Sequence, residues 1–144
     1  MKLYELLNQE KTLRFKNFSN IQALEFAKRV EDIVTSDPDR PVAVRVTLDG
    51  QTILDYRTTG RNGSGWLDRK VKTVLAAQHS SMYVFLNREQ EPYKQWQNDE
   101  TYAVCGGGFP LYINNELRGV LAVSGLNHED DHRVLTTALK EVLA

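Results

Sequence analysis

A β-hairpin before the middle of the chain is the feature that most constrains the fold. Apolar residues occupy every second position of its first segment: Val42, Val44, Val46 and Leu48. Such alternation predicts a strand with one face against a core. Asp49-Gly50 supplies the left-handed backbone that a two-residue hairpin turn needs. The return strand is predicted over residues 53–56, so the chain contains an antiparallel strand pair.

Helical patterns lie on both sides of this hairpin. Residues 1–10 predict a short helix, and Ser19 with Gln22 forms a capping-box pattern at the start of a longer one. Its apolar residues repeat at helical spacing: Ala23, Phe26, Ala27, Val30, Ile33 and Val34. Asp37-Pro38 is predicted to end that helix. Residues 60–65 predict a loop, residues 67–78 a third helix, and Ser80 or Ser81 the N-cap of a fourth.

The last third of the chain predicts further strands and a final helix. A short strand is expected at 102–105, before Gly106-Gly107-Gly108. Two strands rich in β-formers, at 109–113 and 117–123, flank an Asn114-Asn115 turn. Asn127 is predicted to cap a helix that runs toward Ala144. This order of elements predicts an α+β sandwich, an antiparallel sheet with helices packed on it.

Composition limits the classes of function. The 144 residues, 41% of them hydrophobic, predict a single domain over 1–144. A formal net charge of -1 gives neither a basic field for nucleic acid nor a polybasic tail for a membrane surface. One cysteine, Cys105, excludes an internal disulfide and fits a reducing compartment. Without a signal-peptide pattern or a long apolar run, a cytoplasmic location is expected.

The second half of the chain resembles the haem-degrading-domain family, which includes GlcG-like proteins and secreted haem-binding sensor partners. The resemblance rests on Gly107-Gly108-Phe109-Pro110, Gly119, Val123-Ser124-Gly125 and Asp131. A cytoplasmic subgroup without an assigned activity is similar further, through Trp66, Arg69-Lys70, His79-Ser80-Ser81 and Asp131-His132. The resemblance implies an α–β–α sandwich with a central antiparallel sheet flanked by helices, and homo-oligomerisation. It also implies a link to haem or iron in some members and to protein assembly in others.

The glycine run and the residues around Ser124 form one group of candidates. Gly107 and Gly108 permit positive φ and close approach, so they either cradle an anion or form a tight strand connection. Asp131 falls on the apolar stripe of the last helix, where a carboxylate must be hydrogen-bonded or paired. It either accepts hydrogen bonds from the Ser124-Gly125 turn or faces a ligand. No nucleotide-binding glycine motif is present.

Histidine and basic residues form a second group. His128 and His132 have the i, i+4 spacing of a bidentate metal pair, although acidic residues beside them also suit a helix N-terminus. Cys105 is either a soft ligand or a small buried side chain. Arg69 and Lys70 either bind a carboxylate or form a solvated face. His79 beside two serines does not provide a base aligned with a nucleophile.

The family resemblance implies an oligomeric small-ligand-binding domain. An enzyme is less favoured, because no acid, base and nucleophile can be assembled from the spacing of the residues. The predicted ligand site contains Arg69, Lys70, His79, Gly107, Gly108, Ser124, Asp131 and His132. The resemblance makes haem or a related carboxylate-bearing molecule the expected ligand, with Arg69 or Lys70 meeting the carboxylate and a histidine near the iron. The alternative is a structural or assembly homo-oligomer. At least a dimer is expected, with some of Phe15, Phe18, Phe85 and Trp96 buried between subunits.

Overall fold

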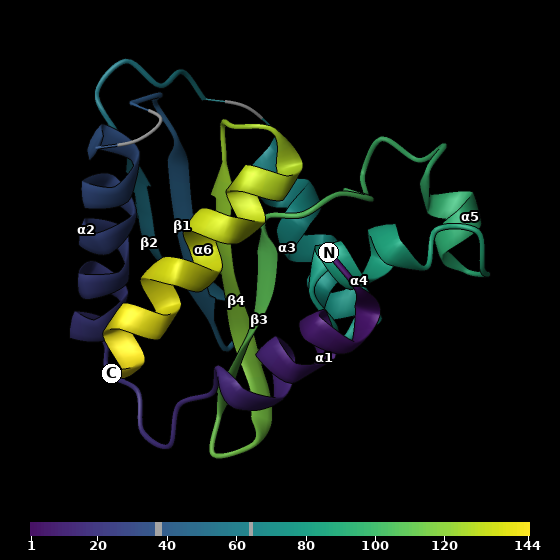
Figure 1. Cartoon of the computed structure of the whole chain (residues 1–144), viewed down its shortest axis with the longest axis horizontal. Coiled ribbons are helices and arrows are strands. Elements are labelled where there is room, and N and C mark those ends of the chain that lie inside the picture. The colour runs from purple at the N-terminus through teal and green to yellow at the C-terminus, as the bar shows by residue number, and fades with distance from the viewer. Residues whose placement is uncertain (37–38, 64) are drawn as a thin grey trace.

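A four-stranded antiparallel sheet forms the centre of the chain (Figure 1), described by a computed structural model over residues 1–36, 39–63 and 65–144. Its strands are β1 (Ala43–Leu48), β2 (Gln51–Arg57), β3 (Gly108–Ile113) and β4 (Glu116–Ser124), in the order β2-β1-β4-β3. Both predicted hairpins are confirmed. Asp49 and Gly50 have φ values of 51° and 80°, the left-handed conformation expected of the first turn.

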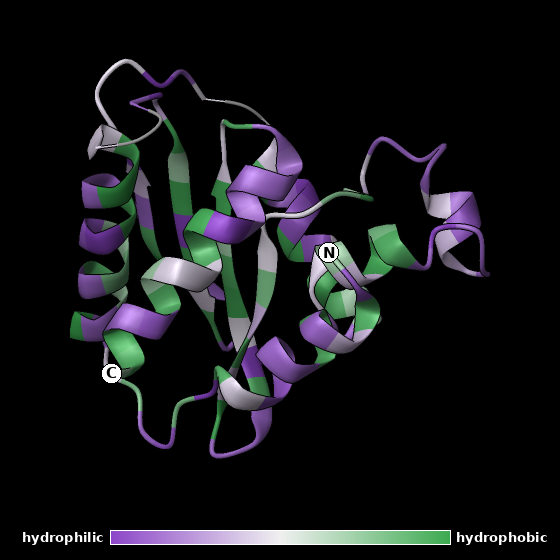
Figure 2. Cartoon of the chain, in the orientation of Figure 1, coloured by the Kyte–Doolittle hydropathy of each residue, from purple (hydrophilic) through white to green (hydrophobic). Residues whose placement is uncertain are grey.

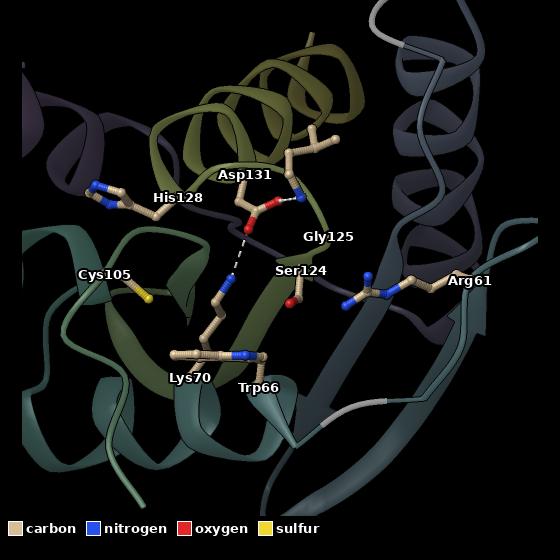
Figure 3. Close-up of a pocket in the computed structure, with 9 residues that line it drawn as sticks. Arg61, Trp66, Lys70, Cys105, Ser124, Gly125, His128 and Asp131 are labelled. Carbon is tan, nitrogen blue, oxygen red and sulfur yellow. Dashed lines mark hydrogen bonds and ion pairs between the residues drawn. The ribbon is translucent and has the colours of Figure 1, made fainter. Parts of the chain in front are cut away.

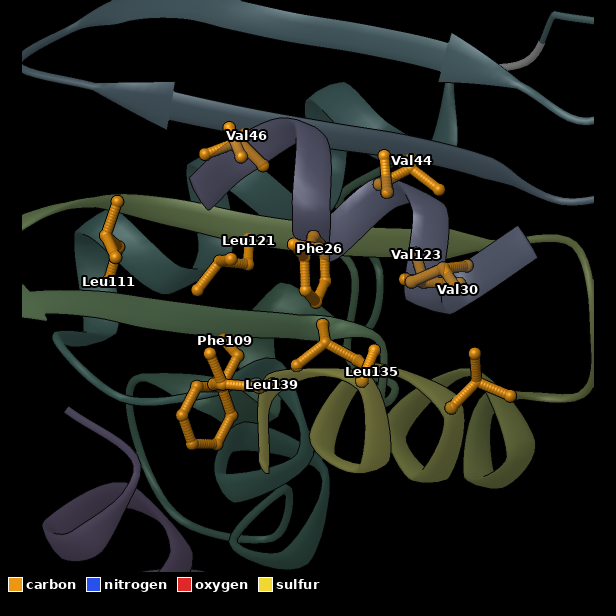
Figure 4. Close-up of a cluster of buried hydrophobic side chains, with 14 of the residues drawn as sticks. Phe26, Val30, Val44, Val46, Phe109, Leu111, Leu121, Val123, Leu135 and Leu139 are labelled. Carbon is orange, nitrogen blue, oxygen red and sulfur yellow. The ribbon is translucent and has the colours of Figure 1, made fainter. Parts of the chain in front are cut away.

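Helices cover both faces of this sheet. Helices α2 (Asn20–Ser36) and α6 (His128–Leu143) pack on one face and α3 (Trp66–Ala77) on the other. The hydrophobic side of α2 faces the sheet in Figure 2 and its hydrophilic side faces away. Figure 4 shows the resulting core, in which Phe26 and Val30 of α2 meet strand residues and Leu135 of α6. The fold is therefore the predicted α+β sandwich.

The remaining helices lie to one side of the sheet. They are α1 (Leu3–Thr12), α4 (Ser81–Leu86) and α5 (Tyr93–Trp96), with α5 on a segment that extends away from the sheet (Figure 1). Glu10 attaches α1 to α4, since its carboxylate accepts hydrogen bonds from both the N–H and the hydroxyl of Ser80. Within the described ranges, no helix is both long and apolar enough to cross a membrane.

The predicted helix starts are confirmed. The Ser80 hydroxyl accepts a hydrogen bond from the N–H of Tyr83, and the Asn127 side chain accepts one from Asp130. The Ser19 N–H donates to Gln22 Oε1 at 2.9 Å, one half of the expected capping box. The predicted stop at Asp37 and Pro38 lies outside the described residues, as does Ser64 of the 60–65 loop.

The strand predicted at 102–105 is wrong, because the N–H of Tyr102 donates to the carbonyl oxygen of Asp99 within a turn and that of Ala103 donates to a side chain. The N–H of Ala103 donates to Thr73 Oγ1 at 2.8 Å, and that of Gly106 donates to His128 Nδ1 at 3.0 Å. An N–H that is bound to a side chain cannot join a strand ladder. This irregular segment carries the chain from α5 to β3 and places Cys105 beside the first turn of α6.

The aromatic residues expected at a subunit interface all make ring contacts within their own chain, Phe85 with His128 and Trp96 with Tyr102. Phe15 is buried, and its ring meets that of Phe18 edge-on with centroids 5.0 Å apart. The exposed large apolar residues of the described chain lie elsewhere, for example Ile21 and Leu24 on α2. Amphipathic spacing identified the buried stripe of α2 but gave no reason to single out these outward positions.

We expect Asn127→Ala to lower the free energy of unfolding by about 1 kcal/mol, because it removes the side-chain cap of α6. Asn127→Ser keeps an oxygen that can accept the hydrogen bond from the Asp130 N–H, so its free energy of unfolding should lie within roughly a few tenths of a kcal/mol of the parent value. Urea unfolding of the three proteins measures this. Equal losses in both variants would show that the cap is not the cause.

Candidate functional site

A pocket of about 360 Å³ lies between α3, the end of β4 and the first turn of α6 (Figure 3). Trp66 and Lys70 enter it from α3, Ser124 from the end of β4, and Asp131 from α6. The full lining is Arg61, Trp66, Lys70, Cys105, Ser124, Gly125, Leu126, His128 and Asp131. Segments far apart in sequence therefore meet at one small cavity.

A buried ion pair forms one wall of this pocket. Lys70 Nζ lies 3.0 Å from Asp131 Oδ2 and donates a second hydrogen bond, of 2.8 Å, to the carbonyl oxygen of Val123. Each residue of the pair is only 2% exposed. The other oxygen of Asp131 accepts a hydrogen bond from the N–H of Leu126 at 2.9 Å. The pair thus ties α3 to β4 and to the start of α6.

Burial raises the pKa of Asp131 above its ordinary value, since the carboxylate loses contact with water. The positive charge of Lys70 and the hydrogen bonds from the N–H groups of Leu126 and Gly125 act in the opposite direction. The carboxylate is therefore satisfied on every side by the protein. A charge buried in this way is retained only because its partners are fixed in place.

The glycine run packs behind the pair. Gly107 has a φ of 118°, and a Cβ atom there would collide with Lys70 Nζ and the carbonyl oxygen of Val123. The N–H of Gly108 donates to Ser81 Oγ at 2.9 Å. Neither glycine is among the residues that line the pocket. These contacts favour a tight connection over an anion cradle for both residues.

His128 and Cys105 lie on the opposite side of the pocket from Arg61 (Figure 3). His128 Nδ1 accepts the hydrogen bond from the Gly106 N–H, so in the neutral ring the proton is on Nε2. Burial raises the pKa of the Cys105 thiol, which keeps it protonated at neutral pH. Both side chains therefore present hydrogen-bond donors.

The other predicted site residues lie outside this pocket. His132 Nε2 is 2.7 Å from Gln9 Oε1, and the ring lines a separate cavity beside α1. The His79 ring stacks on Tyr83, and its Nδ1 is 2.7 Å from Glu10 Oε1. Arg69 donates to the carbonyl oxygen of Tyr102 at 2.7 Å, and its guanidinium lies 3.8 Å from the centroid of Trp66. Of the predicted ligand-binding residues, the structure thus brings Lys70, Ser124 and Asp131 to this pocket, together with the candidates His128 and Cys105.

The two histidines at i, i+4 have different partners. His128 Nδ1 accepts a hydrogen bond from the N–H of Gly106, whereas His132 Nε2 is hydrogen-bonded to Gln9 on α1. Throughout residues 1–36, 39–63 and 65–144, no group of three or more His, Cys, Asp or Glu side chains is placed to hold a metal ion. Each of the two rings thus forms a hydrogen bond to a different part of the chain.

Arg61 lines the pocket without having been predicted to do so, whereas Leu126 lies between the predicted residues Ser124 and Asp131. Arg61 lies in the glycine-rich loop after β2, and a charged residue in such a loop is an obvious candidate only once the loop is placed. Leu126 contributes its backbone N–H, which no side-chain pattern reveals.

Comparison with known proteins finds relatives that match most of the chain. A UPF0303 protein of Psychromonas ingrahamii is 34% identical over 149 residues, which cover 98% of this chain and 92% of that protein. The crystal structure of Ybr137w protein superposes with a TM-score of 0.85 and 25% identity, over 100% of this chain and 91% of the other. A PduOC–heme complex shares the fold, with a TM-score of 0.70 and 19% identity, over 85% of this chain and 93% of the other. The family model described as "Haem degrading protein HbpS-like" matches residues 18–140. This chain therefore belongs to the HbpS-like family of haem degrading proteins.

Proposed function

We propose that the chain is a small-ligand-binding domain that takes a carboxylate group into the Lys70–Asp131 pocket. The observation that carries this proposal is the ammonium group of Lys70. Across the described residues its hydrogen bonds go to Asp131 and to the carbonyl oxygen of Val123, whereas an ammonium has three N–H groups. The third is left for an acceptor on a ligand.

Other donors surround the same space. Arg61 points into the pocket from the loop after β2, and His128 carries its proton on Nε2 (Figure 3). Arg61 and Lys70 bring two positively charged side chains to the lining, which suits an anionic group on a ligand. Trp66 adds an aromatic surface suited to a planar ligand.

The carboxylates of haem fit the hydrogen-bond donors of this pocket, whereas its iron does not. Its two carboxylates match the donors of Arg61, Lys70 and His128. Its iron finds no matching ligand in the pocket. His128 Nδ1 accepts the Gly106 N–H, so Nε2 carries the ring proton and has no lone pair for a metal, and burial keeps the Cys105 thiol protonated. Support for a porphyrin comes from the family description and from the heme complex of PduOC. We therefore propose recognition through carboxylates rather than through iron.

Titration with haemin and with metal-free protoporphyrin IX tests this proposal. Both should bind with similar affinity, followed by their absorbance bands and by quenching of tryptophan fluorescence. Arg61→Gln should weaken binding of both about tenfold, since it removes a charged donor from the pocket. Arg29→Gln, on the exposed side of α2, is the matched control and should bind like the parent.

Three results would contradict the proposal. They are absence of saturable binding, binding of haemin but not of the metal-free porphyrin, and equal affinity of Arg61→Gln and the parent. Binding of haemin alone would indicate that the iron is held by a residue elsewhere in the chain.

A structural or assembly homo-oligomer is the second candidate function. Exposed apolar residues favour it: Ile21 and Leu24 of α2 are 61% and 59% exposed. Side chains of this size are usually covered when they adjoin other apolar surface.

A further inference from the structure

We propose that a second cavity, between α1, α4 and α6, binds a slender apolar molecule with a hydroxyl or N–H group at one end and a carboxylate at the other. The hydroxyl or N–H donates to His132 Nδ1, and the carboxylate lies at Lys140. The cavity has a volume of about 360 Å³. Of the described residues, none lines both this cavity and the Lys70–Asp131 pocket, so the proposal is independent of the function proposed above.

His132 contains a buried nitrogen atom without a hydrogen-bond partner. The residue is 4% exposed, and its ring lines the cavity. Nε2 lies 2.7 Å from Gln9 Oε1, which is an acceptor, so Nε2 carries the ring proton and Nδ1 has a lone pair. Within the described ranges, no group donates to that lone pair. Because buried polar atoms are nearly always paired, the unpaired acceptor indicates a donor that comes from outside the chain.

The His132 ring is neutral at pH 7, which decides what kind of group it can bind. Burial lowers the pKa of His132 from 6.5 to about 4, with smaller contributions from the positive charges of His128 and Lys140. A protonated ring would donate from both nitrogens, whereas the neutral ring keeps the lone pair of Nδ1. The group that meets Nδ1 is therefore a donor, a hydroxyl or an N–H.

Helix α4 gives the cavity an apolar wall. Met82, Phe85 and Leu86 line it, at the i, i+3, i+4 spacing that places side chains on one side of a helix. Met82 is buried, and Phe85 and Leu86 are half-buried. A methionine side chain is flexible and adapts to the shape of its neighbours. The middle of the ligand is therefore hydrocarbon.

Lys140 supplies the positive end of the cavity. It lies on the same side of α6 as His132, eight residues further along, which is about 12 Å at the rise of a helix. The other basic residue of the lining, Arg133, has its Nε 3.4 Å from Asp130 Oδ1. In the part of the chain that the structure describes, no acidic side chain pairs with Lys140. Glu129 is about three turns away from it, so the Lys140 end of the cavity is the one that favours a carboxylate.

Titration with ω-hydroxydecanoate and undecanoate tests the site, because the second acid has a methyl group where the first has its hydroxyl. Calorimetry at pH 7 gives the Kd of both acids for each protein. The ratio of the undecanoate Kd to the ω-hydroxydecanoate Kd should be about tenfold larger for the parent than for His132→Phe, since phenylalanine cannot accept the hydrogen bond. Lys140→Gln should weaken binding of both acids about threefold. Lys94→Gln, on α5 and outside the cavity lining, is the matched control and should bind both like the parent.

Nitrogen-15 NMR of the histidine-labelled parent supplies a measurement that needs no variant. The Nδ1 signal of His132 should move upfield with ω-hydroxydecanoate, because the lone pair then accepts a hydrogen bond, and should stay in place with undecanoate. The proposal is overturned if neither acid binds saturably, if the Kd ratio is the same in His132→Phe and the parent, or if ω-hydroxydecanoate leaves the Nδ1 signal unmoved. A Lys140→Gln protein that binds both acids like the parent would overturn the place given to the carboxylate.

Discussion

Asp131→Asn is expected to lower the free energy of unfolding by about 3 to 5 kcal/mol. The substitution keeps the shape of the side chain and an oxygen for the Leu126 N–H, but it removes the charge that faces Lys70. The ammonium is then buried without a counter-charge, which costs more than the lost attraction alone. Urea unfolding at pH 7 measures the loss.

The double variant Lys70→Met/Asp131→Asn separates this effect from altered packing. It removes both charges, and methionine can follow the path of the lysine side chain through the wall of the pocket. We expect the double variant to recover most of the stability that the single variant loses. A single variant within about 1 kcal/mol of the parent would show that the pair is not desolvated as its burial implies. A double variant no more stable than the single one would assign the loss to packing.

Sequence patterns predicted the local features of this fold because each depends on residues close together in the chain. The Asp49-Gly50 turn and the Ser80 and Asn127 caps need only a few neighbouring residues. The strand expected at 102–105 failed because the N–H groups of Ala103 and of Gly106, the residue just after it, bind Thr73 and His128, which lie far away in sequence. A short stretch of sequence around this segment does not contain the side chains that compete for its N–H groups.

In the candidate site too, features that depend on nearby residues could be predicted and features that depend on distant residues could not. Asp131 was expected to be buried and satisfied, since it lies on the apolar stripe of its helix. Its partner was not identified, because Lys70 is 61 residues away. Arg69 and Lys70 were treated as equivalent, yet neighbouring residues on a helix point about 100° apart, so only Lys70 enters the pocket. His128 and His132 share one side of α6 but their ring nitrogens have separate partners, and rotamers of this kind cannot be predicted from spacing.

Acidification from pH 7 to pH 4 is expected to cost about 3 kcal/mol of stability through His132, at about 1.4 kcal/mol per pKa unit. Burial lowers the pKa of His132 from 6.5 to about 4, with smaller contributions from the positive charges of His128, Lys140 and the N-terminus. The unfolded chain binds a proton near pH 6.5 and the folded chain does not. Stability from this residue is therefore complete above pH 6.5 and is lost as the pH falls toward 4.

Comparing His132→Gln with the parent isolates this contribution, since all other titrating groups are common to both proteins. The free energy of unfolding, measured with urea at half-unit steps between pH 7 and pH 4, should fall less steeply in the variant. His79→Gln is the control, because the His79 ring is partly exposed and pairs with Glu10. We expect the free energy of unfolding of this variant to fall with decreasing pH as steeply as that of the parent, since His132 is still present. Parallel curves for His132→Gln and the parent would mean that His132 accepts a proton inside the folded protein, and that the hydrogen bond to Gln9 holds the charged ring as readily as the neutral one.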